Sequence, residues 1–438
     1  MTSPTSRSGH GVVLLYHWPL AFWHRNASTV LEHVGAFRRH SRFPILEVNV
    51  DAGFPPALER VEPRAMIMHY SLFGVQHYLL DDQWLAWLAR SRAYKIAFFQ
   101  DEHFACRRRF NFLNDFQVDC VYTCLEPSEF SKVYGAYTEV PKLVSNLPGY
   151  VSEGLLETGQ RFTLPDGRRP IDVGYRGRPL AVYMGRGAQE KHLIGRRFAE
   201  LAAGSGLRLD IAGGEGDRLY GDDWYRFISR CRAVLGVESG VSAFDLEGEV
   251  YAEYVRLLEE RGAVGIADLE SLSEWEDVVY YRTISPRHFE AAALRACQVL
   301  FEGRYSGILQ PMVHYIPLEK DFSNMERVIA LIKDAEVRGE LTRNAHRDLI
   351  ASGEWGYERL IESVDGTLQE AGVSEEPDSA GQAALRSALR RGALVRRTRR
   401  QLDWLLRALL SRPLVIRAAR LVHPVTSRVR RLMGPRAA

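Results

Sequence analysis

Short apolar runs of strand length alternate with amphipathic stretches through the first third of the chain. Apolar positions at helical spacing, as in Thr29–His40 and Asp82–Arg92, predict helices between these runs. Strands that alternate with helices indicate βαβ units and a parallel sheet. We expect strands over Val12–Tyr16, Ile45–Val50, Ala65–Met68, Lys95–Phe99 and Cys120–Thr123.

A second series of the same kind follows a polar break near 152–170. Its expected strands are Leu180–Met184, Leu207–Ala212, Ala233–Gly236, Val264–Ala267 and Gln298–Phe301. Its expected helices are Gly195–Ala203, Trp224–Cys231, Val250–Arg261, Pro286–Ala296 and Ser323–Asp334. Two successive α/β series predict two Rossmann-like domains that face a central cleft, with ligands bound beyond the carboxyl ends of the strands.

Composition fits this picture of a globular protein. The chain has 438 residues, which is too long for one typical core, and 46% of them are hydrophobic. Its five cysteines are odd in number and include no CxxC pair, so we expect packing residues rather than disulfides or a zinc site. The N-terminus does not resemble a signal peptide, and no apolar run is long enough to span a membrane. These features predict a cytoplasmic protein.

The charge is distributed unevenly along the chain. Residues Ala383–Ala438 hold 15 Arg, no Lys and one acid, Asp403, so this tail carries +14 while the whole chain carries +2. Apolar residues fall at helical spacing within it, at Leu402, Leu405, Leu406, Leu409 and Leu410. We favour an amphipathic helix on anionic lipid at the inner face of the membrane. A partner protein or the acidic body of the chain is the second reading, and nucleic acid is the least favoured.

The turn after Leu180–Met184 carries two cations. The apolar run stops at Gly185, Arg186 follows directly, Lys191 comes five positions later, and a helical pattern begins near Leu193. Backbone N–H groups and the dipole at a helix start attract anions, so this unit predicts a diphosphate site. Many such units carry the same residues without a ligand, and that alternative stays open.

Polar residues also follow the strands of the first series. His17, His69 and the run Gln100-Asp101-Glu102-His103 stand where α/β enzymes place reactive groups. Asp101, Glu102 or His103 could supply a general base, and His17 or His69 could hold an acceptor hydroxyl. The alternative is that these loops are polar only because their backbone reaches water.

The second series offers further candidate ligands at its strand ends. Glu238 and Ser239 follow one strand, and Glu302, Ser306 and Gly307 lie in the loop after another. Arg287 and Glu290 begin the helix between these loops. Glu290 either complements the helix dipole or accepts hydrogen bonds from both hydroxyls of a ribose.

The whole pattern resembles the glycosyltransferase B (GT-B) fold, and specifically CgeB-type and glycosyl transferase family 1-type proteins. The segments that carry the resemblance are KIAFFQDEHF (95–104), DVGYRGR (172–178), MGRGAQEK (184–191), RLYGDDW (218–224), VESGVSAFD (237–245) and SPRHFEAA (285–292). It implies that Arg186 and Lys191 grip the donor diphosphate and that Glu290 holds the ribose. Retaining relatives carry a second Glu eight residues before this one, where this chain has Arg282.

The expected organisation is an N-terminal acceptor domain over 10–165 and a nucleotide-sugar donor domain over 166–350. A helix over 351–372 would return to the N-terminal domain, and a linker with the Arg-rich tail would occupy 373–438. In this fold, side-chain cations and helix dipoles stabilise the leaving diphosphate, so we expect no metal and no cofactor.

The predicted activity is that of a hexosyltransferase-type glycosyltransferase in polysaccharide biosynthesis at the cell envelope. A nucleotide diphosphate-sugar would be the donor, and the acceptor would be a hydroxyl of a surface or lipid-linked glycan. The alternatives are a nucleotide-sugar epimerase of the same fold and a non-catalytic coat or surface-assembly protein.

Overall fold

The computed structural model describes residues 11–19, 29–60, 62–74 and 78–376, together with 386, 387, 389, 390, 394 and 398. The predicted amphipathic helix at 402–410 and the rest of the tail beyond 398 lie outside the described residues. Among the described helices, none combines the length and the apolar character needed to cross a bilayer.

The N-terminal lobe is built on a six-stranded parallel sheet of order β2-β1-β3-β4-β5-β6. Its central strands are apolar and buried on both faces, as expected for strands covered by helices on both sides. The strands are β1 (Val12–Tyr16), β2 (Ile45–Asn49), β3 (Ala65–Met68), β4 (Tyr94–Phe98), β5 (Cys120–Thr123) and β6 (Lys142–Ser145). The first five were predicted to within one residue at each end. The edge strand β6 was not, because its four residues are only partly apolar and none is buried.

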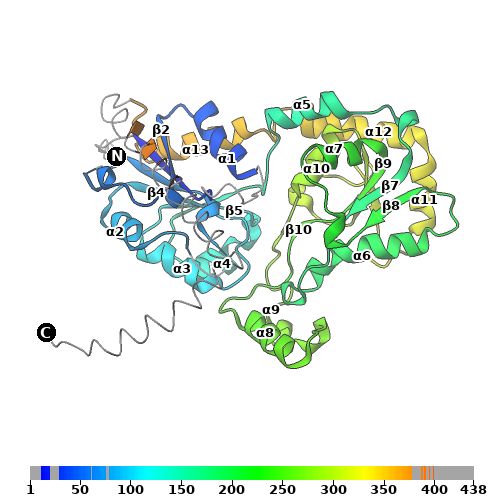
Figure 1. Cartoon of the computed structure of the whole chain (residues 1–438), viewed down its shortest axis with the longest axis horizontal. Helices are drawn as coiled ribbons and strands as arrows, with labels where there is room; N and C mark the ends of the chain where they lie inside the picture. The colour runs from blue at the N-terminus through cyan, green and yellow to red at the C-terminus, as the bar shows by residue number, and fades with distance from the viewer. Residues whose placement is uncertain are drawn as a thin grey trace, which may run out of the picture.

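Helices α1 (Thr29–His40), α2 (Asp82–Arg90), α3 (Cys106–Asp115) and α4 (Phe130–Tyr137) connect these strands. The last described helix, α13 (Tyr357–Glu370), returns from the far end of the chain and packs against α1. Leu360, Ile361 and Val364 of α13 belong to the same core cluster as Phe37 of α1. Figure 1 shows this C-terminal helix beside α1 on the N-terminal lobe.

The C-terminal lobe is built on a five-stranded parallel sheet of order β13-β12-β9-β7-β8. Its strands are β7 (Ile171–Arg176), β8 (Leu209–Ala212), β9 (Cys231–Gly236), β12 (Cys297–Phe301) and β13 (Ile316–Leu318). Its helices are α5 (Glu153–Phe162), α6 (Arg186–Leu201), α7 (Asp222–Arg230), α10 (Pro286–Ala293), α11 (Met325–Lys333) and α12 (Ala335–Ala345), and a π-helical turn follows at His346–Ala351. Two parallel sheets flanked by helices confirm the predicted α/β class with two Rossmann-like units.

Two predicted strands of this lobe are wrong. Leu180–Met184 is a loop that ends in a short 3₁₀ turn, and Val264–Ala267 overlaps another 3₁₀ turn at Ile266–Asp268. Neither stretch is buried, whereas Ile171–Arg176 is buried between its two neighbours β8 and β9. Helix α6 also begins earlier than predicted, at Arg186, directly after Gly185 with φ of 84°.

A long excursion between β9 and α10 joins the lobes, and we call residues 240–282 the bridging segment. It contains α8 (Glu249–Arg261) and α9 (Leu272–Trp275), which lie apart from the second sheet in Figure 1. The Asp245 N–H donates to the His103 carbonyl at 2.8 Å, and the Glu102 N–H donates to the Tyr281 hydroxyl at 3.0 Å. Apolar residues of the segment, among them Phe244, belong to the same core cluster as residues of the N-terminal lobe. The bridging segment therefore holds the loop after β4 against the C-terminal lobe.

The two sheets share one topology. Numbered within each lobe, the strands run in the order 2-1-3-4-5, with one further edge strand in the N-terminal lobe. The connection reverses direction between β1 and β3 in the first sheet and between β7 and β9 in the second. Ligands of doubly wound folds bind at such switch points, beyond the carboxyl ends of the strands.

Candidate functional site

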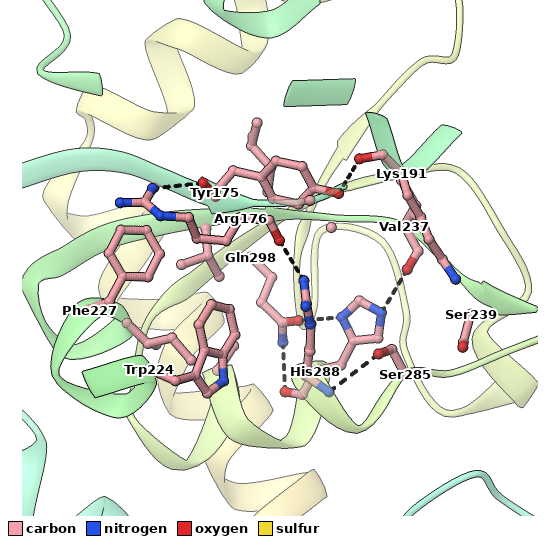
Figure 2. A pocket seen from close by; sticks show the side chains of 18 of the residues that line it. Tyr175, Arg176, Lys191, Trp224, Phe227, Val237, Ser239, Ser285, His288 and Gln298 are labelled. Carbon is pink, nitrogen blue, oxygen red and sulfur yellow. Dashed lines mark hydrogen bonds between the residues drawn. The ribbon is translucent and has the colours of Figure 1, made fainter. Parts of the chain in front are cut away.

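A pocket of about 320 Å³ opens at the switch point of the C-terminal lobe. Residues from both switch-point strands line it, with α6 on one side and α7 and α10 on the other (Figure 2). Apolar and polar side chains both line it, and the buried polar residues His288 and Gln298 are among them. The lining comprises Gly174–Arg178, Leu180, Lys191, Trp224, Phe227, Ile228, Val234–Val237, Ser239, Ser285, Arg287, His288, Ala291 and Gln298.

Glycines keep the strand floor free of side chains. A Cβ at Gly174 would lie 2.3 Å from the Cys231 sulfur, and a Cβ at Gly236 would lie 2.7 Å from a methyl group of Leu300. Both distances are far shorter than ordinary van der Waals contact. Any larger residue at these strand positions would therefore collide with the packing beneath the pocket.

Four cationic side chains line the pocket: Arg176, Arg178, Lys191 and Arg287. One guanidinium nitrogen of Arg287 donates to the Arg176 carbonyl at 2.6 Å, and Arg176 itself pairs with Asp210 at 2.7 Å. Lys191 extends toward Ser239 in Figure 2, and its ammonium group has no hydrogen-bond or ion-pair partner among the described residues. Burial lowers the pKa of Lys191, and the neighbouring Arg287 cation lowers it further. An incoming anion would therefore interact favourably with this partly desolvated cation.

Two aromatic rings form the opposite wall. Trp224 and Phe227 of α7 lie side by side in Figure 2. The guanidinium of Arg287 lies 4.9 Å from the Trp224 ring, and that of Arg176 lies 4.1 Å from the Phe227 ring. Cation–π contacts of this kind orient both guanidinium groups along the wall.

Glu290 of α10 adjoins the pocket through Trp224 and is not itself among the residues that line it. The Trp224 indole N–H donates to its Oε2 at 2.7 Å. Burial raises the pKa of Glu290, although this hydrogen bond and the Arg287 cation oppose the rise. An aromatic ring and several cations thus line one cavity, and a carboxylate is hydrogen-bonded to that ring.

The N-terminal lobe contributes Asp101 and His103 across the cleft from this pocket. Burial lowers the pKa values of both His103 and Lys191, and the charge of the exposed Asp101 opposes this decrease. Burial nevertheless holds the pKa of His103 at about 4, with Arg109 and Lys191 adding to the decrease. The imidazole is therefore neutral at pH 7, and its Nδ1 is buried without a hydrogen-bond partner among the described residues. The charge of Lys191 in the C-terminal lobe therefore interacts with Asp101 and His103 of the N-terminal lobe.

Glu102 is in a different environment from its two neighbours. It is 3% exposed, and its carboxylate accepts hydrogen bonds from the Thr123 and Tyr134 hydroxyls and from the Cys124 N–H at 3.2 Å. Burial raises its pKa to about 7 despite these bonds. The structure places this candidate general base in the core, where it joins β5 to α4.

His17 lines a separate depression, with Asp51 and Trp84 among its neighbours. Its Nε2 lies 3.7 Å from an oxygen of Asp51, and its backbone N–H donates to the Ser71 hydroxyl at 2.9 Å. The structure does not bring His17 into the lining of the pocket around Lys191.

The predicted donor-site residues also separate into two groups. Lys191, Ser239 and Arg287 line the pocket, and Glu290 adjoins it through Trp224. Gly185 and Arg186 lie outside its lining, at the start of α6.

The remaining candidates hold a loop in place. Glu238 is buried and accepts hydrogen bonds from the Tyr280 hydroxyl at 2.6 Å and the Tyr305 N–H at 2.8 Å. Ser306, whose φ is 55°, bonds to Thr283 through its hydroxyl at 2.8 Å, and Gly307 completes the turn with φ of 73°. Glu302 is exposed at the start of this loop.

Several pocket residues were not singled out from the sequence, above all Arg176 and Trp224. The signal for Arg176 was its position at the end of the run Ile171–Arg176, which was not assigned as a strand. Trp224 belonged to a predicted helix without any sign of which face it would present. Among the described residues, no group of three or more His, Cys, Asp or Glu side chains is arranged to hold a metal ion. The five cysteines are free and buried.

No protein-family model and no curated protein sequence matches this chain. Among solved structures, Anabaena HepE in complex with UDP-glucose is similar over 82% of this chain and 100% of its own, with 12% identity and a TM-score of 0.46. A glycosyltransferase from Rickettsia africae is similar over 83% of this chain and 99% of its own, with 8% identity and a TM-score of 0.45. TarM has 11% identity over 80% of this chain and a TM-score of 0.38, and this chain spans 59% of its length. TM-scores below 0.5 assign no function to this chain.

Proposed function

We propose that this protein is a glycosyltransferase that moves a sugar from a nucleoside diphosphate donor to an acceptor hydroxyl. The observation that carries the proposal is the pocket at the second switch point, where Lys191 and Arg287 stand at the mouth beside the Trp224 ring and Glu290. The base would stack on Trp224, Glu290 would face the ribose, and the diphosphate would meet the two cations. Phosphate oxygens are the ligands that such cations prefer.

The chemistry follows from this placement. The acceptor oxygen attacks the anomeric carbon, the bond from that carbon to the diphosphate breaks, and the acceptor proton passes to a base. Lys191 and Arg287 would stabilise the negative charge that develops on the departing diphosphate. Asp101 is the better candidate for the base, because it is an exposed carboxylate on the facing lobe, whereas the His103 imidazole is buried.

Further parts of the proposal rest on the sequence. The acceptor would be a surface or lipid-linked glycan, and the basic tail would attach the enzyme peripherally to an anionic membrane. The transfer is proposed to need neither a metal nor a cofactor. Arg282, at the position of the second acid of retaining relatives, forms ion pairs with Glu190 at 3.3 Å and Asp277 at 3.2 Å, and the proposal assigns no stereochemical course.

Calorimetric titration of the full chain with UDP, GDP, ADP, CDP and dTDP tests the proposal. At least one nucleotide should bind with a submillimolar Kd, and Lys191→Met should weaken that binding by roughly 1.5–3 kcal/mol, the value of a charged hydrogen bond. Lys333→Met is the matched control, because Lys333 lies on α11 of the same lobe, outside the pocket lining. No binding of any of the five nucleotides to the folded protein would contradict the proposal.

A further inference from the structure

The N-terminus of α6 is the place in the C-terminal lobe where an anion would ordinarily bind. The helix is 16 residues long and follows the switch-point strand β7 after a glycine-containing loop. The first N–H groups of a helix have no partner within the helix, and its dipole places partial positive charge there. Helix starts of this kind commonly receive phosphate groups.

A carboxylate of the same chain already occupies this position. The Arg186 N–H donates to Glu276 Oε1 at 2.9 Å, and the Gly187 N–H donates to the Ser242 hydroxyl at 2.7 Å. The Ser242 hydroxyl in turn donates to Glu276 Oε1. Glu276 and Ser242 both belong to the bridging segment, and Glu276 lies 90 residues from Arg186 in the sequence.

The space around this carboxylate is filled. The Glu276 side chain is 6% exposed, and its Oε2 is buried with no hydrogen-bond partner in the described part of the chain. A Cβ added at Gly185 would lie 2.4 Å from the Ser242 hydroxyl and 2.7 Å from Glu276 Oε1. The arrangement leaves no room for a phosphate group beside the first turn of α6.

The Arg186 side chain is exposed to solvent and does not line the pocket. It is 74% exposed, and its nearest guanidinium nitrogen lies 3.9 Å from Glu276 Oε2. Lys191, one and a half turns further along α6, is the cation of this helix that lines the pocket.

We propose that Glu276 is a resident anion that keeps phosphate away from the N-terminus of α6, so that the cations lining the pocket, among them Lys191 and Arg287, receive the diphosphate. The inference rests on the proposed function and sharpens it. The carboxylate neutralises the partial charge of the helix start, and therefore an incoming diphosphate gains nothing there. Arg186 then contributes little to donor binding, although its spacing from Lys191 in the sequence indicates a paired role.

Backbone contacts hold the resident anion in place. The Phe244 N–H donates to the Trp275 carbonyl at 3.0 Å, and the Asp277 N–H donates to the Ser242 carbonyl at 2.8 Å. Phe244 also packs in the core cluster shared with the N-terminal lobe. Moving Glu276 away from α6 would require this part of the bridging segment to move as well.

Titration with inorganic pyrophosphate and UDP tests the inference, because pyrophosphate reports on the phosphate position without a base. Lys191→Met should weaken both ligands at least 10-fold. Arg186→Met should change either Kd less than 2-fold, although it removes an equal charge from the same helix. Glu276→Ala should leave the first site intact and add a second, weaker pyrophosphate site, whereas Glu276→Gln should keep the stoichiometry at one.

The outcomes separate this inference from the function on which it rests. If Arg186→Met weakens pyrophosphate as strongly as Lys191→Met does, the resident-anion inference fails while nucleotide binding stands. A loss of binding in a folded Glu276→Gln protein would overturn the inference in the same way. If wild-type protein binds neither pyrophosphate nor any of the five nucleotides, both proposals fail. The comparison of the Arg186 and Lys191 variants remains decisive even if Glu276→Ala does not fold.

Discussion

The two lobes have the same strand order, but the switch point is filled by side chains in one lobe and open in the other. In the N-terminal lobe the space between β1 and β3 is filled: Ser71 accepts a hydrogen bond from the His17 N–H at 2.9 Å and lies 2.8 Å from His69 Nδ1. The buried His33 ring packs 4.8 Å from the His69 ring. In the C-terminal lobe the equivalent space between β7 and β9 is an open pocket.

The difference teaches that topology supplies the location of a site and side-chain volume decides whether a site forms there. Imidazole rings and a hydroxyl occupy the first switch point, where His69 Nδ1 lies 2.8 Å from the Ser71 hydroxyl. His69 Nε2 and both nitrogens of His33 are buried without a hydrogen-bond partner among the described residues. The second switch point is an open pocket lined by cations, and glycines at 174 and 236 allow the side chains around it to pack against the strands. The following predictions test this contrast.

The largest effect is expected for Glu102→Ala. It leaves the Thr123 and Tyr134 hydroxyls without their buried acceptor, and the free energy of unfolding should fall by about 3 kcal/mol. Asp101→Ala is the matched control, since Asp101 is exposed and its removal should change stability by less than about 0.5 kcal/mol. Urea denaturation measures both. Equal losses for the two variants would contradict a structural role for Glu102.

The second effect concerns acid stability at the filled switch point. Burial holds the pKa of His33 at about 3, while the unfolded chain takes up the same proton near pH 6.5. The unfolded state therefore binds more protons between these values, and stability falls as the pH falls from 6.5 toward 3.

Replacing His33 with Phe should remove this contribution to the pH dependence of stability. The contribution amounts to roughly 2 kcal/mol in the free energy of unfolding between pH 7.5 and pH 5. Urea denaturation at the two pH values measures the difference. His40→Phe, at the end of the same helix, should keep the wild-type slope. An unchanged slope in His33→Phe would show that His33 is not held neutral by the fold.

The third effect concerns the open switch point. Trp224→Ala removes the proposed stacking surface and should weaken UDP or the preferred nucleotide about 10-fold, within the 1–3 kcal/mol that stacking on an aromatic ring contributes. Tyr220→Ala is the matched control, because Tyr220 is an exposed aromatic residue four positions earlier and outside the pocket lining. Trp224→Phe should retain most of the affinity. An equal loss of nucleotide affinity in the Tyr220 variant would contradict stacking of the base on Trp224.

The smallest effect compares one serine at each switch point. Ser71→Ala removes the acceptor of the His17 N–H and the neighbour of His69 Nδ1, and the free energy of unfolding should fall by about 1 kcal/mol. Ser239→Ala changes a hydroxyl that lines the open pocket, and it should alter stability by less than about 0.5 kcal/mol. Thermal unfolding of the two variants measures the difference in stability. A larger loss of stability in Ser239→Ala than in Ser71→Ala would contradict the prediction.

Prediction from the sequence succeeded where the pattern was strongly periodic. Helix α1 was predicted with its observed bounds, and the first five strands were predicted to within one residue. Leu180–Met184 was taken for a strand because it is apolar and precedes a glycine, yet the buried position belongs to Ile171–Arg176. That error also displaced the start of α6 and concealed Arg176 at the end of the true strand.

The candidate site was predictable only in part. Lys191, Ser239, Arg287 and Glu290 lie in or beside one pocket, as the positions after strands and at helix starts suggested. Glu102 has the same kind of position in the sequence and is buried in the core instead. A residue after a strand turns inward or outward according to the packing of other elements, here α4 and β5, and that packing leaves no local signal.

The sequence by itself determined the class of fold, because hydrophobic periodicity is a local property and two α/β series require two parallel sheets. It also placed the candidate groups at the carboxyl ends of strands. Only the tertiary structure decided which of those groups share a cavity, which switch point stays open, and that Glu276 meets the start of α6. These outcomes depend on contacts between residues far apart in the chain, whose meeting is set by the volume and hydrogen bonding of everything packed between them.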